Sequence, residues 1–420
     1  MTLNRRIFIG SGVAATALLS APMVRAQGKP RVVVIGGGAG GGTAARYLAK
    51  DSKGDLDVTL IEANKTYTTC FFSNLYLGGF YDWEKLQHGY DTIAAGGVTV
   101  INDTATAVDR AAKTVTLAGG QVIPYDRLVL APGIDFKEGS VPGWTLADAE
   151  VMPHAYKAGP QTQLLKRMVD SMPQGGVFAM VAPPNPYRCP PGPYERISMV
   201  AHVLKTTNPT AKILIADPKE NFSKKALFEE GWARHYDGMV DWIGPDRGGD
   251  VVEVRPGSME IVIDGEVTKV DVCNVIPGQM AGKIAALAGV TADSGWAPVH
   301  PDSMRSKLDD NIYVLGDSSA QGDMPKSGFS ANSQAKVAAL AIRGELLGAR
   351  VFPAKYANTC WSLIAPEDGV KVGAAYEPTP EKIASVQSFI SQTGEDAALR
   401  KATYEESLGW YAGITADIFG

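Results

Sequence analysis

The pattern of apolar and polar positions along the chain predicts strands that alternate with helices. Residues 31–35 read RVVVI and predict a buried parallel strand, because both faces of such a strand are covered by helices. A glycine-rich turn follows, then a helix predicted over 43–50 and a strand that is predicted to begin at residue 57 and to end at Glu62. This order of elements predicts an α/β chain with a parallel sheet.

The same order recurs in the middle of the chain. Strands predicted at 177–181 and 212–217 flank a helix predicted over 194–205. The turn after the first of these strands reads APPNPYRCPPGPY, and its prolines have no N–H to offer a phosphate. We therefore expect two dinucleotide-binding (Rossmann-like) domains and a smaller C-terminal domain, with no NAD(P)H bound by the second of the two folds.

The first glycine turn fits the dinucleotide fingerprint G-x-G-x-x-G. Gly36 permits the tight turn, Gly38 lets the backbone approach a pyrophosphate, and Gly41 lets the helix pack closely on the strand. Glu62 ends the next strand, where a carboxylate can accept hydrogen bonds from ribose hydroxyls. Strand, glycines, helix and distal acid together predict a bound dinucleotide.

Two later motifs indicate that this dinucleotide is FAD. One predicted strand runs into Ala131 and Gly133, and another ends in Gly316 and Asp317. Both motifs resemble those of flavoproteins with two dinucleotide-binding domains, in which the Gly-Asp pair approaches the ribityl chain of the flavin. A helix predicted to begin near Ser330 would point the positive end of its dipole at the flavin.

Composition and the N-terminal segment narrow the class of protein. The net charge of −5 over 420 residues argues against a nucleic-acid partner, which would require a basic face. Residues 1–26 read as a twin-arginine signal peptide, so we expect export to a bacterial periplasm. No later run of 18 apolar residues occurs, so we expect no integral membrane segment after cleavage.

Four cysteines are candidates for redox chemistry: Cys70, Cys189, Cys273 and Cys360. They allow three complete pairings, and their spacing does not choose among them. Cys189 precedes a predicted helix, whose N-terminus we expect to lower the thiol pKa, and Glu195 in the first turn could relay protons. Cys273 lies in an apolar run and reads as a buried thiol. No zinc-like spacing and no C-x-x-C-H haem motif occurs, so we expect no metal site.

Four segments resemble the flavoprotein subunit of flavocytochrome c sulfide dehydrogenase, and the resemblance covers essentially the whole mature chain. They are YTTCFFSN at 67–74, YRCPPGPYER at 187–196, MPKSGFSANSQ at 324–334 and NTCWSLIAP at 358–366.

The resemblance implies a set of roles for the candidate residues. It implies FAD bonded through its 8α-methyl to the sulfur of Cys70, and a redox-active disulfide between Cys189 and Cys360 with Glu195 nearby. It also implies a c-type cytochrome subunit as the partner in a heterodimer, which supplies the haem that this chain lacks. The function implied is periplasmic oxidation of sulfide to sulfur or polysulfide, with electrons passed through FAD to the cytochrome.

Alternative functions stay open at this point. A sulfide:quinone oxidoreductase-like enzyme would share the fold, and a paralogue could act on another sulfur compound. An NAD(P)H-dependent disulfide or persulfide reductase is disfavoured by the proline-filled turn. A non-enzymatic flavoprotein would need no pairing of Cys189 with Cys360.

The expected domain organisation has four parts. Residues 1–26 form the signal peptide, and residues 29–142 together with 280–350 form a discontinuous FAD-binding domain. Residues 143–279 form the second Rossmann-like domain, without a nucleotide site. Residues 351–420 form a C-terminal domain that covers the flavin or contributes to a subunit interface.

Overall fold

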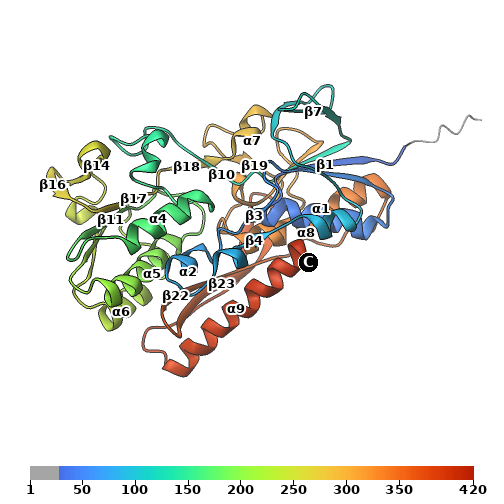
Figure 1. Cartoon of the computed structure of the whole chain (residues 1–420). Coiled ribbons are helices and arrows are strands. Elements are labelled where there is room, and N and C mark those ends of the chain that lie inside the picture. Colours follow the sequence, from blue (N-terminus) through green and yellow to red (C-terminus); the bar gives the residue numbers. More distant parts are fainter. Residues whose placement is uncertain (1–27) are drawn as a thin grey trace, which may run out of the picture.

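A computed structural model describes residues 28–420, and the predicted signal peptide over 1–26 lies outside the described residues. A five-stranded parallel sheet in the order β20-β9-β1-β2-β5 forms one half of the molecule (Figure 1). Its strands are β1 (Arg31–Ile35), β2 (Asp57–Ile61), β5 (Thr99–Ile101), β9 (Arg127–Leu130) and β20 (Ile312–Val314). The predicted glycine fingerprint therefore lies at the carboxyl end of the central strand β1.

Two helices pack together beside this sheet, α1 (Ala39–Ser52) and α8 (Gly328–Leu347). α1 begins four residues before the predicted start at residue 43, so part of the glycine run forms its first turn. The Ser327 side chain caps α8 by accepting a hydrogen bond from the Ser330 N–H at 3.1 Å. Three short helices surround the sheet: α2 (Ser73–Leu77), α3 (Asp91–Ala95) and α7 (Lys283–Leu287). Two pairs of short strands also lie there, β3 (Tyr67–Thr68) with β4 (Gln87–His88) and β19 (Ala297–Pro298) with β21 (Ser319–Ala320). A small antiparallel sheet contains β6 (Ala105–Asp109), β7 (Thr114–Leu117) and β8 (Val122–Pro124).

A second parallel sheet, in the order β13-β12-β11-β17, forms the opposite half of the molecule (Figure 1). Its strands are β11 (Val177–Val181), β12 (Lys212–Ala216), β13 (Val240–Ile243) and β17 (Val272–Val275). It is accompanied by α4 (Pro160–Asp170), α5 (Gly192–Thr207), α6 (Lys225–His235) and the antiparallel β14 (Val252–Arg255), β15 (Glu260–Ile263) and β16 (Glu266–Lys269). Cys273 on β17 is completely buried, as predicted.

Asp217 directly follows β12, at the position where a dinucleotide-binding fold has the acid that binds a ribose, and other side chains of the domain surround it. The Asp217 carboxylate accepts hydrogen bonds from the Tyr194 hydroxyl at 2.5 Å and the Trp242 indole at 3.0 Å, and pairs with Lys219 at 2.6 Å. The Tyr194 ring stacks on Phe222 with ring centres 3.5 Å apart. The carboxylate is thus engaged inside the domain, and this supports the expectation that the second fold binds no NAD(P)H.

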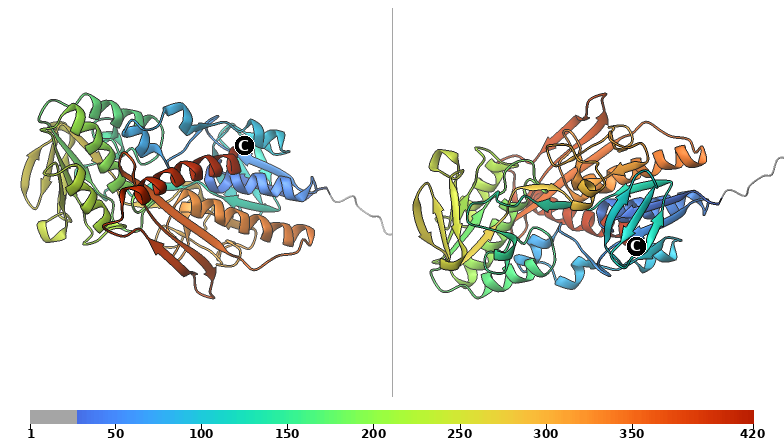
Figure 2. Two further views of the ribbon diagram at one scale, coloured as in Figure 1. Left: turned by 90° about the horizontal axis from the view of Figure 1, so that it is seen from below. Right: turned by 90° about the horizontal axis from the view of Figure 1, so that it is seen from above.

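The C-terminal part consists of an antiparallel sheet and one long helix. The sheet contains β22 (Tyr356–Ala365), β23 (Asp368–Pro378) and β24 (Ile383–Ile390), and the helix is α9 (Ala397–Phe419). β22 packs on α5 and α8, while α9 follows β23 and ends beside α1 (Figure 2). Tyr411, Ile414 and Ile418 of α9 are buried, so this stretch belongs to the core. β22 therefore reaches both halves of the molecule.

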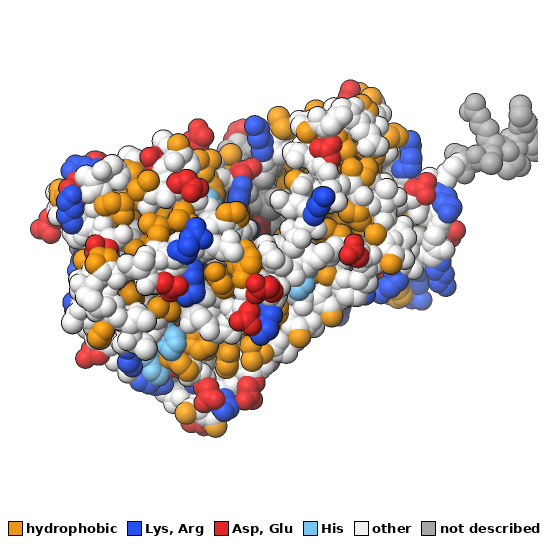
Figure 3. All heavy atoms as spheres, in the orientation of Figure 1, with side chains coloured by type: hydrophobic (Ala, Val, Ile, Leu, Met, Phe, Trp, Pro, Cys, Tyr) orange, Lys and Arg blue, Asp and Glu red, His pale blue; other side chains and the backbone are white. Residues whose placement is uncertain are grey.

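The two halves are also linked by β10 (Ile134–Phe136), which pairs antiparallel with β18 (Gln279–Ala281). Charged side chains of both signs are interspersed over the face shown in Figure 3. Among residues 28–420, no helix combines the length and the apolar character that crossing a membrane requires.

Candidate active site

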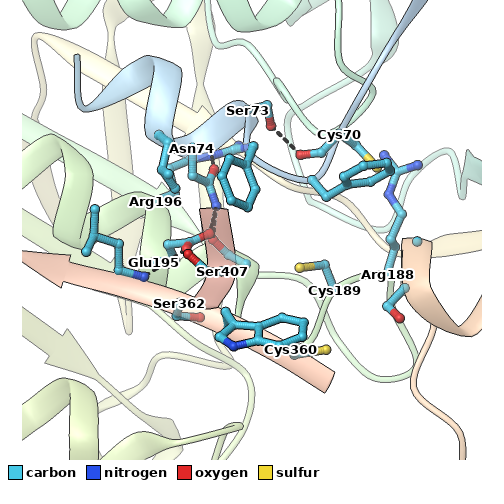
Figure 4. Close-up of a pocket in the computed structure, with 18 of the residues that line it drawn as sticks. Cys70, Ser73, Asn74, Arg188, Cys189, Glu195, Arg196, Cys360, Ser362 and Ser407 are labelled. Atoms are coloured by element: carbon cyan, nitrogen blue, oxygen red, sulfur yellow. Dashed lines mark hydrogen bonds between the residues drawn. The ribbon is translucent and has the colours of Figure 1, made fainter. Parts of the chain in front are cut away.

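A cavity of about 80 Å³ lies where α2, α5 and β22 meet, and we call it the thiol pocket (Figure 4). Three of the four cysteines line it, namely Cys70, Cys189 and Cys360. Glu195 lines it as well. The structure thus brings together side chains that are far apart in the sequence and that we predicted for catalysis (Cys189, Cys360 and Glu195) or for cofactor attachment (Cys70).

Cys189 is held in an unusual backbone conformation just before α5. Its φ of 54° lies in the left-handed region, where its N–H donates to the Lys326 carbonyl at 2.7 Å and its own carbonyl accepts from the Gly192 N–H at 2.7 Å. Burial raises the pKa of the Cys189 thiol well above its ordinary value, and the neighbouring Cys360 and Glu195 raise it further. The expected lowering of this pKa by the helix N-terminus is therefore wrong, because desolvation and like charges outweigh it.

Cys360 lies on β22 and is 9% exposed. Its sulfur lies 3.3 Å from the Asn358 side-chain nitrogen. Burial raises the Cys360 pKa, whereas the Asn358 hydrogen bond and the charge of Lys224 oppose the rise. Both Cys189 and Cys360 are free thiols in this structure, so their pairing in a disulfide stays a prediction.

Glu195 connects three parts of the chain. It lies in the first turn of α5, accepts a hydrogen bond from the Asn74 amide of α2 at 2.8 Å, and accepts another from the Leu363 N–H of β22 at 3.0 Å. Burial raises the pKa of the carboxyl group, although these hydrogen bonds and nearby cations oppose the rise. A carboxyl group in this position can hold and release a proton inside the pocket.

Sequence reasoning missed Lys224, a buried cation next to the thiol pocket. Its ammonium group donates to the Cys360 carbonyl at 2.9 Å and to the Ser362 hydroxyl at 2.8 Å. Burial lowers the pKa of Lys224 to about 8. No local sequence pattern predicts this buried position, because two consecutive lysines before a helix are usually exposed to solvent.

A second cavity, of about 360 Å³, adjoins the thiol pocket, and we call it the dinucleotide cavity. The two share lining residues, among them Cys70 and Arg188. The predicted cofactor residues that line the dinucleotide cavity are Gly36, Gly38, Glu62, Cys70, Ala131, Gly133, Gly316 and Asp317. Gly41 is the one predicted cofactor residue that does not line this cavity. Its lack of a side chain allows the close turn between β1 and α1.

The glycine turn leaves no room for side chains at two of its positions. Gly36 has a φ of 97°, and a Cβ there would lie 2.4 Å from the Ala131 carbonyl oxygen. A Cβ on Gly41 would lie 1.8 Å from the Gly36 carbonyl oxygen. Such close approach of the backbone between strand and helix is the role that the fingerprint assigns to these glycines.

The side chains of the dinucleotide cavity fit FAD. Oδ1 of Asp317 is buried without a hydrogen-bond partner, although Oδ2 lies 3.6 Å from Arg188. A ribityl hydroxyl is a donor that would satisfy this oxygen. The Glu62 carboxylate is oriented by the N–H groups of Gly37 at 2.7 Å and Asn64 at 2.9 Å. Across the described chain, no group of three or more His, Cys, Asp or Glu residues could hold a metal ion.

His154 is a buried, pH-sensitive side chain that is 8% exposed and directly precedes Ala155, a residue that lines the thiol pocket. Burial, with a smaller effect of nearby cations, lowers its pKa to about 3. An unfolded histidine has a pKa of about 6.5, so below that pH the unfolded chain binds a proton that the folded chain does not. The contribution of the neutral His154 side chain to the free energy of unfolding is complete above about pH 6.5. It is lost as the pH falls, so that the free energy of unfolding is lower by about 2 kcal/mol at about pH 5.

We therefore expect the His154→Gln protein to lose less of its free energy of unfolding than the wild type between neutral pH and about pH 5. Urea unfolding of wild type and variant at neutral pH and at about pH 5 measures this difference. The glutamine can still accept the hydrogen bond that the Tyr156 N–H donates to the His154 ring at 3.1 Å. Equal loss of stability in both proteins on acidification would assign the acid sensitivity to other groups.

The fold and the two adjoining cavities define an FAD-dependent oxidoreductase fold of the disulfide-reductase type. Residues 30–165 match the family model "Pyridine nucleotide-disulphide oxidoreductase". Residues 162–277 match "Sulfide dehydrogenase [flavocytochrome c] flavoprotein chain, central", and residues 353–419 match "Flavocytochrome c sulphide dehydrogenase, flavin-binding". The chain belongs to the family of the flavoprotein chain of flavocytochrome c sulfide dehydrogenase.

Individual relatives agree with this family. The flavocytochrome c sulfide dehydrogenase flavoprotein chain of Chlorobaculum thiosulfatiphilum is 49% identical over 47 residues, which are 11% of this chain and 96% of that sequence. A mitochondrial sulfide:quinone oxidoreductase of Dictyostelium discoideum is 22% identical over 304 residues, covering 69% of this chain and 65% of that protein. The matches to the longer curated relatives span less than two thirds of each of them.

A solved structure shows the same fold over nearly the whole chain. The sulfide:quinone oxidoreductase of Aquifex aeolicus superposes with a TM-score of 0.69 at 19% identity and covers 92% of both chains. At 19% identity, the similarity between the two proteins is evidence for the fold alone. The predicted family and the predicted disulfide-reductase fold are both confirmed.

Proposed function

We propose that this protein oxidises sulfide to sulfur or polysulfide in the bacterial periplasm and passes the electrons to a c-type cytochrome subunit. One observation carries the proposal: Cys189, Cys360 and Glu195 line a single small pocket, and that pocket shares Cys70 with the cavity that fits FAD. The family membership supports sulfide as the substrate. The twin-arginine segment supports the location.

The reaction begins, in this proposal, with Cys189 and Cys360 joined in a disulfide. Hydrosulfide attacks one of the two sulfurs, a new S–S bond forms, and the old one breaks. The electron pair of the broken bond stays on the other cysteine as a thiolate, while the attacked cysteine becomes a persulfide. Glu195 accepts the proton when hydrogen sulfide rather than hydrosulfide enters, because its carboxylate faces the same pocket.

Residues at the junction of the two cavities hold the cofactor. Cys70 lines both cavities, and this supports the proposed thioether between its sulfur and FAD. The glycine turn and the N-terminus of α1 would hold the pyrophosphate, and the Asp317 carboxylate would accept a hydrogen bond from the ribityl chain. Bound FAD supplies the oxidant that takes up the electron pair and releases electrons singly to a haem.

Two measurements test this proposal. Digestion of the mature protein without reductant, followed by mass spectrometry, should find flavin on Cys70 and a link between Cys189 and Cys360. Anaerobic sulfide titration should bleach the flavin, and cytochrome c should reoxidise it faster than a quinone does. A free Cys70 with releasable flavin would overturn the covalent linkage, and preferential reoxidation by quinone would favour a sulfide:quinone oxidoreductase-like enzyme.

A further inference from the structure

Lys224 is a buried lysine with two neutral hydrogen-bond partners at the edge of the thiol pocket. The residue is 5% exposed, and its backbone takes the left-handed conformation, with φ of 65°, just before α6. Its ammonium reaches β22 and donates to the Cys360 carbonyl at 2.9 Å and the Ser362 hydroxyl at 2.8 Å. Burying a lysine without a carboxylate partner in hydrogen-bond contact is costly, which calls for a functional explanation.

The titratable groups that face this ammonium all belong to the thiol pocket. They are Cys360 of β22, Glu195 of α5 and Cys189 in the turn before α5. The nearby Arg196 guanidinium is turned to other partners, the Asn74 and Asn274 side chains at 3.1 and 2.9 Å. The charge of Lys224 therefore acts on the two cysteines and the one acid of the proposed reaction.

The two cysteines differ in what surrounds their sulfurs. Ser327 donates to Asn358 Oδ1 at 2.5 Å, which turns the amide nitrogen of Asn358 toward Cys360, 3.3 Å from its sulfur. In the part of the chain that the structure describes, the sulfur of Cys189 accepts no comparable hydrogen bond. Negative charge is thus better supported on Cys360 than on Cys189.

We infer that Lys224 is a positioning residue of the thiol pocket, which fixes β22 at Cys360 and, together with Asn358, makes Cys360 rather than Cys189 the sulfur that carries a thiolate. This inference rests on the proposed function for its role in the reaction. Hydrosulfide would bond to the sulfur of Cys189, and the pair of electrons from the broken disulfide would remain on Cys360. The lowered pKa of Lys224, about 8, is still high enough to keep the ammonium charged at neutral pH.

Thiol alkylation tests the inference without sulfide. The FAD-loaded full-length protein is reduced and treated anaerobically with iodoacetamide across a pH series, and each cysteine peptide is quantified by mass spectrometry. We expect the alkylation midpoint of Cys360 to lie below that of Cys189 in the wild type. Lys224→Gln keeps donors for the Cys360 carbonyl and Ser362 but removes the charge that the wild type carries at neutral pH. It should slow the alkylation of Cys360 at about pH 7 by about tenfold.

Matched variants separate charge from structure. Lys224→Arg retains the charge and should leave Cys360 close to wild type. Lys225→Gln changes the next residue, whose ammonium bonds to the Glu220 carbonyl at 3.2 Å and lies 3.6 Å from the centre of the Trp242 ring, and it should leave both midpoints unchanged.

Two results would overturn the inference: a wild-type Cys189 that titrates below Cys360, which needs no variant, or a Lys224→Gln protein in which Cys360 is alkylated at the wild-type rate at about pH 7. Failure of sulfide to bleach the wild-type flavin would refute the proposed function instead. The alkylation result would stand in that case, because it is measured without sulfide.

Discussion

Replacing Cys189 by serine should abolish reduction of the flavin by sulfide, with a rate loss of roughly a thousandfold or more. A serine hydroxyl cannot form the disulfide that hydrosulfide must attack, and the residues lining the pocket include no other partner for Cys360 once Cys70 is joined to FAD. Rapid mixing with sulfide under anaerobic conditions, followed by flavin absorbance, measures the rate. Dithionite should still bleach the variant, because the dinucleotide cavity is unchanged.

Cys273→Ala is the matched control for this prediction. Cys273 is completely buried on β17 and lies outside the thiol pocket, so its variant should keep the wild-type rate of sulfide reduction. If Cys189→Ser matched the wild-type rate as well, sulfide would have to deliver its electrons elsewhere. The proposed disulfide mechanism would then be wrong.

Replacing Gly41 by alanine should prevent FAD binding and destabilise the fold by about 3 kcal/mol or more. The new methyl group would lie 1.8 Å from the Gly36 carbonyl oxygen, so the turn between β1 and α1 must open. That turn presents the backbone N–H groups to the pyrophosphate. The flavin-to-protein absorbance ratio of the purified protein and its melting temperature measure the two effects.

The neighbouring Gly40 gives a control within the same helical turn. A Cβ on Gly40 would find its nearest neighbour, the Ala131 Cβ, at 3.5 Å, which is an ordinary contact. Gly40 lines the dinucleotide cavity, so this control concerns stability: Gly40→Ala should melt like the wild type, because its methyl group meets no protein atom at an unfavourable distance. A Gly41→Ala protein with a full complement of FAD would show that the turn can rearrange and that the close approach is dispensable.

Buried parallel strands were the easiest elements to predict from the sequence. β1 and β11 have the predicted bounds, because strands covered on both faces are continuous apolar runs with sharp ends. The start of α1 was harder, since the run that forms its first turn is rich in glycine, a poor helix former. The turn before α1 also brings Gly41 close to the Gly36 carbonyl, and helix propensities do not include such a contact.

The candidate site was predictable to the extent that its residues occur in motifs. Cys189, Glu195 and Cys360 lie in such segments, and the structure places them in one pocket. The pKa of Cys189 could not be predicted, because it depends on how completely the folded chain encloses the thiol. Lys224 could not be predicted either, since its partners lie on a strand more than a hundred residues away.

The placement of Cys70 beside Cys189 and Cys360 also bears on the fidelity of oxidation. Three thiols around one small cavity could form three different disulfides, and only one of these is the proposed redox pair. A thioether from Cys70 to FAD would remove one thiol from exchange and leave a single possible partner for each of the others. Attachment of the cofactor would then determine which disulfide forms in this pocket, because only Cys189 and Cys360 would remain as free thiols there.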